Sequence, residues 1–469
     1  MTWNLAKPDA ALPLSCFWTW DHSANWVLDD PGMLTFGCAN AYLKTPETFV
    51  EDYRRLTDLA ASLGVRGIII WGFLRVSHGG VDAARRVADY AASRGVAVLP
   101  GVGLTWYGGV YYEGDHPYNL DTFLRKHPDA RLVPRAGLNL PSGEGGVCPL
   151  HPAFRDWLRE GLQWLFREFN IGGVNLENGD FIVCHCPRCT GHRASWPDTD
   201  PDFFRMQALA YLPAIDALRE HLSDKLVTWA TYTSFSFGLP AQFPDDTWPS
   251  IGAHVPTLAE RAHPDSIAQW TLTGVVKSPP MPLAGFLDDG TPEELFDNPY
   301  WPAHLIPPTP RSIGFIHHGS QWTARGAVER YRLILSTIKE ACTRAHRAGM
   351  HGVVIHGEVT SRHVPWALNY LAFSHFIHHP EDSLRQFGRD TLGTVLGSED
   401  AGETFVEVLA HWESGTLTET AKADALARAR SLRKTVSSGA RDDLERFHFW
   451  QWLVRMTSGE TEPHTASFF

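Results

Sequence analysis

Residues 171–192 read IGGVNLENGDFIVCHCPRCTGH, and this stretch decides the fold. It begins as an apolar run, which stops abruptly at the four residues Glu177 to Asp180. Three cysteines follow within the next nine residues. Acidic side chains at the end of a buried strand predict an active site there, because barrel enzymes gather their functional groups where strands end and loops begin.

Strand-like runs alternate with amphipathic helical runs over most of the chain. A helix is predicted over 46–63, with Thr45 as its cap, Pro46 in its first position and Gly64 at its end. Eight strands with helices between most of them predict an α/β fold, a closed (β/α)8 TIM barrel with a C-terminal helical extension. The runs predicted as strands are 15–22, 65–73, 96–106, 171–180, 226–235, 266–276, 312–322 and 351–359.

The pattern becomes purely helical toward the C-terminus, in segments such as 403–412, 421–434 and 442–456. We therefore expect two regions. Residues 1–380 would form the barrel, and residues 381–469 would form a helical region packed on it.

The composition of the 469-residue chain, whose net charge is −12, excludes some classes of binding partner. No polybasic run is present, so nucleic acid is not expected as a partner. No apolar run reaches the ~18 residues of a membrane span. The seven cysteines are odd in number, which favours a reducing compartment. With no signal-peptide pattern at the first residues, a cytoplasmic location is predicted.

Three acids are the candidate catalytic residues. Side chains alternate along a strand, so Glu177 should face into the barrel at its rim. Glu358, near the end of the last predicted strand, should face inward by the same argument, and Asp180 lies three residues beyond Glu177. Paired carboxylates serve as general acid and as base or nucleophile. The alternative is that each acid pairs with an arginine or caps a helix.

Aromatic and polar side chains at predicted strand ends are the candidate substrate-binding residues. Tryptophan is abundant, with 18 residues, and aromatic rings suit the apolar faces of sugars. The alternative is that the rings fill a large core and that the histidines are merely hydrogen-bonded neighbours. The candidates are Asp21, His22, Trp71, Trp106, His317, His318, Trp322 and His356.

The cysteine-rich segment predicts a metal site. Cys184, Cys186, Cys189 and His192 follow the spacing C-x-C-x2-C-x2-H, and thiolates with an imidazole suit a tetrahedral zinc ion. Such a zinc would be structural, because three thiolates leave the ion closed and electron-rich. No cofactor is then required for catalysis. Three reduced thiols without an ion, or an iron–sulfur cluster, are the alternatives.

Four segments carry a resemblance to a known group of enzymes. They are 108–119 (GGVYYEGDHPYN), 148–162 (CPLHPAFRDWLREGL), 174–189 (VNLENGDFIVCHCPRC) and 357–373 (GEVTSRHVPWALNYLAF). Over about the first 380 residues the chain resembles glycoside hydrolase barrels of the α-glucuronidase and β-N-acetylhexosaminidase type and their uncharacterised relatives.

The resemblance implies that Glu177 is the proton donor. The chain departs from the hexosaminidase pattern of adjacent Asp-Glu, since Asn-Gly separates Glu177 from Asp180. It also lacks an acid at the end of the seventh predicted strand, where many retaining barrels keep their nucleophile. The second carboxylate would then be Glu358 or Asp180.

These observations predict a glycosidase that acts on a carbohydrate substrate by carboxylate catalysis. A metal-dependent sugar isomerase or lyase is one alternative, which an ion bound by Glu177, Asp180 or a rim histidine would favour. A non-catalytic sugar-binding barrel is the other, which binding without turnover would favour. The oligomeric state cannot be read from the sequence.

Overall fold

The structure is a computed structural model of the 469-residue chain. It describes residues 10–26, 44–134, 146–177, 184–194, 202–220, 224–230, 259–273, 311–316, 333–356, 359–360 and 365–413, and the short pieces 418–420, 423–424, 427–428 and 431.

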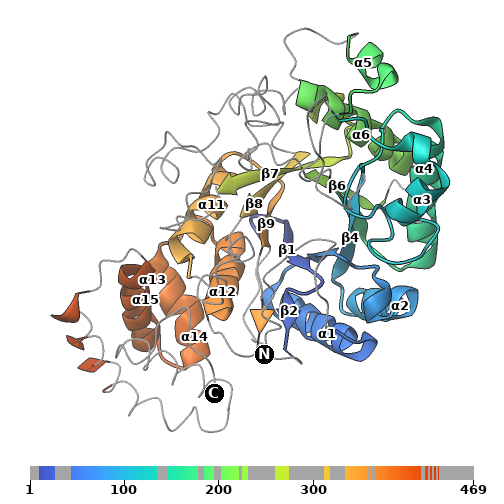
Figure 1. Ribbon diagram of the computed structural model, residues 1–469. Coiled ribbons are helices and arrows are strands. Elements are labelled where there is room, and N and C mark those ends of the chain that lie inside the picture. Colours follow the sequence, from blue (N-terminus) through green and yellow to red (C-terminus); the bar gives the residue numbers. More distant parts are fainter. Residues whose placement is uncertain are drawn as a thin grey trace.

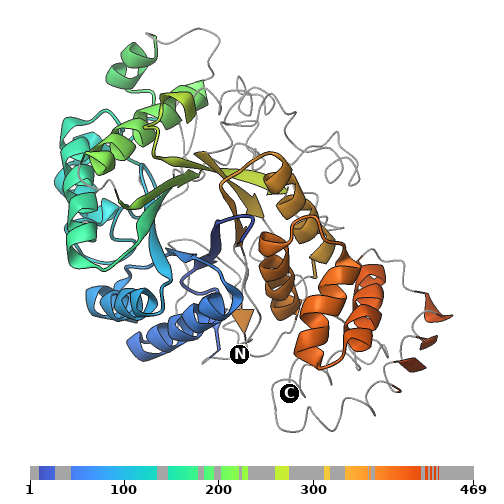
Figure 2. The same cartoon turned by 180° about the vertical axis from the view of Figure 1, so that it is seen from behind.

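Eight parallel strands form a closed barrel in the order β1-β3-β4-β5-β6-β7-β8-β9 (Figures 1 and 2). The first strand pairs with both β3 and β9, which closes the cylinder. The predicted (β/α)8 barrel is therefore confirmed, strand by strand. The strands are β1 (Leu14–Trp20), β3 (Gly67–Trp71), β4 (Ala97–Gly103), β5 (Gly173–Glu177), β6 (Leu226–Ala230), β7 (Ile267–Thr273), β8 (Ser312–Ile316) and β9 (Gly352–His356).

The surrounding helices begin and end where the sequence signals them. Thr45 accepts a hydrogen bond from the backbone N–H of Thr48 in a capping box, and Gly64 ends α1 (Pro46–Leu63) in the left-handed conformation with φ 73°. The other helices around the barrel are α2 (Gly80–Ser93), α4 (Pro152–Glu168), α6 (Asp202–Arg219), α11 (Leu335–Arg347) and α12 (Pro365–His378). Within the described ranges, no helix combines the length and the apolar character that crossing a bilayer requires.

Two apolar layers result from the alternation of side chains along the strands. Val174, Leu176, Val353 and Ile355 belong to the outer layer, between the strands and the helices. Val354 belongs to the inner layer, which fills the barrel with Trp18, Trp20, Trp71 and other side chains. The predicted facing of these residues of β5 and β9 is confirmed.

The chain continues after α12 through α13 (Leu384–Gln386), the π-helical turn η5 (Phe387–Leu392), α14 (Gly393–Leu396) and α15 (Glu399–Glu413). These elements lie beside α12 at one side of the barrel (orange to red in Figures 1 and 2). Most of their buried apolar residues, Phe387 and Phe405 among them, belong to the outer apolar layer. The helices predicted within 421–434 and 442–456 lie almost wholly outside the described residues.

Candidate functional site

Glu177 is the last residue of β5, at the carboxyl end of the strand. It lies beside Gly103 of β4 and Ala230 of β6, and it is 2% exposed. Asn175, two residues earlier on the same face, donates to Thr228 Oγ1 at 2.9 Å and to Gln269 Oε1 at 3.2 Å. The position of β5 in the barrel thus holds the Glu177 backbone between two neighbouring strands.

An aromatic layer crosses the barrel beneath its mouth. The ring of Trp71 lies 5.8 Å from that of Trp20 and 6.2 Å from that of Trp18, and its Nε1 donates to Asn175 Oδ1 at 3.2 Å. The indole occupies the space above Gly101, where a Cβ atom would stand 2.4 Å from the ring. A glycine on β4 therefore makes room for the large ring next to the polar face of β5.

The loop after β4 carries Tyr107 to the same aromatic layer. Tyr107 has φ 55°, and Gly108 and Gly109 follow with φ 75° and 80°. A left-handed conformation at a large non-glycine residue is uncommon and is found at functional sites. The Tyr107 ring lies 5.9 Å from that of Trp71 and 6.2 Å from that of Trp20, in edge-on contacts. It is half-buried, whereas both tryptophans are buried.

A buried charged network lies at the end of β1. Arg75 Nε donates to Asp21 Oδ2 at 2.6 Å, His22 Nδ1 lies 3.3 Å from Asp21 Oδ1, and Arg75 also binds Glu113. Burial alone would raise the pKa of Asp21, but the charge of Arg75, helped by His22 and His78, outweighs it and lowers that pKa to about 2. Burial raises the pKa of Glu113 above its ordinary value. Asp21 is thus held as a carboxylate.

All five predicted substrate-binding residues that the structure describes are buried. Their exposed fractions are 0% for Asp21, 2% for His22, 0% for Trp71, 6% for Trp106 and 0% for His356. Little of these side chains is therefore open to solvent. Five other predicted site residues lie outside the described residues, namely Asp180, Glu358, His317, His318 and Trp322.

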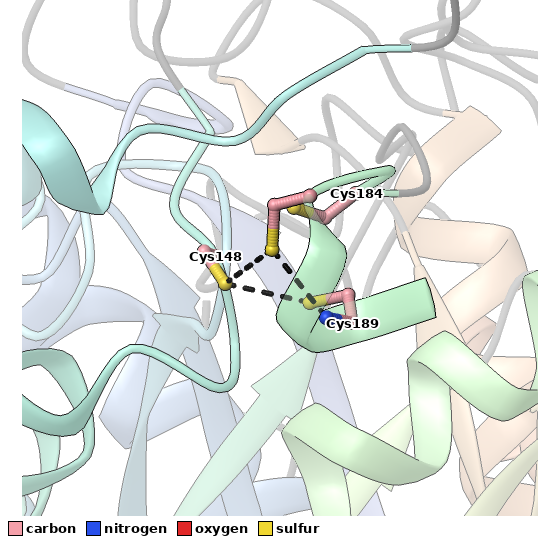
Figure 3. Close-up of side chains that lie close together, drawn as sticks. Cys148, Cys184 and Cys189 are labelled. Atoms are coloured by element: carbon pink, nitrogen blue, oxygen red, sulfur yellow. Dashed lines mark hydrogen bonds between the residues drawn. The ribbon is translucent and has the colours of Figure 1, made fainter. Parts of the chain in front are cut away.

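Four cysteines converge at one point near the end of β5. Cys148, Cys184, Cys186 and Cys189 bring their sulfur atoms within 4.8 Å of one another. Figure 3 shows the thiols of Cys148, Cys184 and Cys189 pointing toward each other from two separate segments. Hydrogen bonds from the thiols of Cys148 and Cys189 lower the pKa of Cys184 far below its usual value.

The group of side chains that the structure brings together differs in one member from the four predicted metal ligands. His192 is exposed and does not belong to the group, and Cys148 takes the place expected for it. His192 lies one helical turn beyond Cys189 on α5 (Pro187–Arg193), near the end of that helix. Within the described ranges, these four thiols are the single group of three or more side chains suited to an ion, and Glu177 is not part of it.

Three residues that shape the site were not predicted from the sequence, namely Cys148, Arg75 and Glu113. Cys148 was visible as a cysteine just before a helix, but nothing in its spacing linked it to the segment that begins at Cys184. Arg75 stands in a buried apolar run just after β3, and an arginine there signals a buried partner. Glu113 stands in the long loop after β4, where only the structure reveals that it pairs with Arg75. Tyr107 of the same loop was expected as an aromatic residue at the rim of the barrel.

No protein-family model matches the chain, and no curated protein matches it. Similar solved structures include a GH138 enzyme targeting pectin rhamnogalacturonan II, at 11% identity and TM-score 0.48 over 86% of this chain and 44% of that one. A GH36 α-galactosidase from Geobacillus stearothermophilus has 12% identity and TM-score 0.41, over 81% of this chain and 43% of that one. The glycoside hydrolase domain of PgaB from Bordetella bronchiseptica has 11% identity and TM-score 0.46, over 73% and 93%. The chain spans less than half the length of the first two. All three similar structures are of glycoside hydrolases.

Proposed function

We propose that the chain is a glycosidase in which Glu177 acts as general acid. The observation that carries the proposal is the place of Glu177, at the carboxyl end of a barrel strand and two residues beyond Asn175 on the face that looks into the barrel. Functional groups of (β/α)8 enzymes gather at this end of the strands.

The surroundings of Glu177 suit a sugar. The half-buried ring of Tyr107, in the loop after β4, packs edge-on against the buried rings of Trp20 and Trp71. Aromatic rings offer apolar faces, and a polar tip such as the Tyr107 hydroxyl can bond to a sugar hydroxyl. The buried network of Asp21 and Arg75 would position His22 at the same rim.

A second carboxylate is required for hydrolysis, as base or as nucleophile. We propose Glu358 or Asp180 for this role. A separation of ~5 Å between the two carboxyl groups would predict retention at the anomeric carbon, and ~6.5–9.5 Å would predict inversion.

The substitution Glu177→Gln tests the proposal. Removing a general acid should lower kcat/KM by ~10²–10⁴-fold on natural oligosaccharides, whose leaving oxygen needs a proton. The loss should be much smaller on nitrophenyl glycosides, because nitrophenolate leaves without one. Turnover would be measured on a panel of α- and β-linked substrates of both kinds.

A matched control is Glu160→Gln, which changes an exposed glutamate of α4 and should leave both rates unchanged. An undiminished rate of Glu177→Gln on the oligosaccharide would contradict the role. An equal loss on both kinds of substrate would contradict it too, since that pattern belongs to a nucleophile.

A further inference from the structure

We propose that Cys148, Cys184, Cys186 and Cys189 bind one zinc ion, and that this ion fastens together the loops after β4 and β5. The site lies outside the proposed glycosidase chemistry. Its ligands are four thiolates from two chain segments.

The spacing of the sulfur atoms fits a single tetrahedral ion. A Zn–S bond of about 2.3 Å places the sulfurs of a tetrahedral site about 3.8 Å apart. Cys148 Sγ lies 3.4 Å from Cys189 Sγ and 3.7 Å from Cys186 Sγ, and all four sulfurs lie within 4.8 Å of one another. A multi-iron cluster attaches its cysteines to different iron atoms and therefore needs its sulfurs farther apart.

The chemical state of the four cysteines also fits a zinc site. All are free cysteines, and three are buried while Cys186 is half-buried. A single buried thiol packs as a small apolar group and needs no ligand. Four sulfurs that face one another are a different case, and all four ligands of a structural zinc site are commonly cysteines.

The backbone holds the two segments in place around the sulfurs. Cys148 N–H donates to Ala130 C=O at 2.8 Å, and His185 N–H donates to Val133 C=O at 2.7 Å. The Cys186 sulfur accepts from the N–H of Cys189 at 3.4 Å, which caps the first turn of α5. Two of these are backbone hydrogen bonds to the segment 130–133, so the arrangement of the thiols does not depend on the sulfur contacts alone.

The position of the site suggests its use. Cys148 lies in the connection from β4 to α4, and Cys184 follows the end of β5 at Glu177 by seven residues. An ion bound here would hold together the connections that leave two neighbouring strands. It would restrict the chain next to the proposed general acid without touching the substrate.

Metal analysis of the full chain, purified without chelators, tests the proposal. We expect about one zinc per chain. Cys148→Ser and Cys189→Ser should each reduce the zinc content severalfold or more. Two controls should keep it, namely His192→Ala beside the site and Cys342→Ser, which alters a buried cysteine of α11. Glu177→Gln should also keep its zinc, which separates this proposal from the glycosidase proposal.

Cobalt keeps the test decisive if the serine variants fail to fold. Removing zinc from the unaltered protein and adding Co²⁺ should produce intense thiolate-to-metal absorption bands and the visible bands of a tetrahedral ion. The proposal is overturned by iron in place of zinc, by a disulfide-bonded chain without metal, or by zinc that is lost from His192→Ala and kept in Cys148→Ser. Failure of Co²⁺ to produce the thiolate bands overturns it as well.

Discussion

At the scale of single residues, the free-energy cost of burying a charged side chain is offset by an oppositely charged partner that lies far away in the sequence. Asp21 and Arg75 are 54 residues apart and both are fully buried. The sequence placed Asp21 at a strand end, but its partner could not be predicted, because the pairing depends on how β1 and β3 lie side by side in the barrel. Removing one member of such a pair leaves a buried charge alone, which costs far more than the intact pair contributes.

His78 should make stability depend on pH. Its ring stacks on Phe49, with centroids 3.7 Å apart, and its Nε2 lies 2.8 Å from the Gly72 carbonyl oxygen. Burial lowers the pKa of His78 from 6.5 to about 4, although nearby Asp21 opposes the change and Arg75 adds to it. The unfolded chain therefore takes up this proton first as the pH falls. The stability that His78 contributes is complete above pH 6.5 and is lost as the pH falls toward 4.

Replacing His78 with glutamine should flatten this dependence. The amide can still donate to the Gly72 carbonyl but does not titrate over this range. The slope of the unfolding free energy between pH 6.5 and 4 should decrease by up to about 1.4 kcal/mol per pH unit. Urea unfolding at several pH values measures the slope. His192→Gln, at an exposed position, should leave it unchanged, and an unaltered slope in His78→Gln would show that His78 is not the group responsible.

At the scale of elements, the sequence predicted strands and helix ends well because their signals are local. Side chains of β5 and β9 alternate between the two faces of the sheet, and Thr45 and Gly64 cap α1. Each of these signals is visible within a single strand or helical turn. The sequence did not predict that Cys148 joins the other three cysteines, because Cys148 comes from another connection of the barrel. The spacing within one segment favoured His192 as the fourth ligand, whereas the fold brings Cys148 next to the sulfur atoms of Cys184, Cys186 and Cys189.

The packing of β3 against β4 yields a prediction about Gly101. A Cβ at this position would stand 2.4 Å from the Trp71 ring, whose Nε1 is already bonded to Asn175. Gly101→Ala should therefore overpack the barrel and lower the unfolding free energy by about 1–3 kcal/mol. Denaturant unfolding measures the change.

Gly191 offers the matched control for this substitution. It lies in α5, where an added Cβ atom would meet no other atom within 4 Å, and its φ is not in the left-handed region. Gly191→Ala should be neutral or stabilising, by up to about 1 kcal/mol. Equal stabilities for the two variants would mean that Trp71 is free to move aside.

At the scale of the whole molecule, the helices after α12 share one apolar layer with the barrel. Phe405 of α15 and Phe387 of η5 belong to the same cluster as the outer faces of the strands. His375 of α12 bonds Thr391 of η5, with 2.9 Å between Nδ1 and Oγ1. The boundary predicted at residue 380 stays a prediction, and this packing argues that the helices on either side of it unfold together.

Phe405→Ala tests that coupling. Removing a buried phenylalanine leaves a cavity and should cost about 3–5 kcal/mol. If the layer is one cooperative unit, hydrogen exchange should accelerate both in α15 and in the barrel strands β1 and β9. Val76→Ala is the control, because Val76 is 55% exposed and its loss should change stability by less than about 0.5 kcal/mol. Faster exchange confined to the helices after α12, with the strands unchanged, would show instead that the C-terminal helices form a separate folding unit.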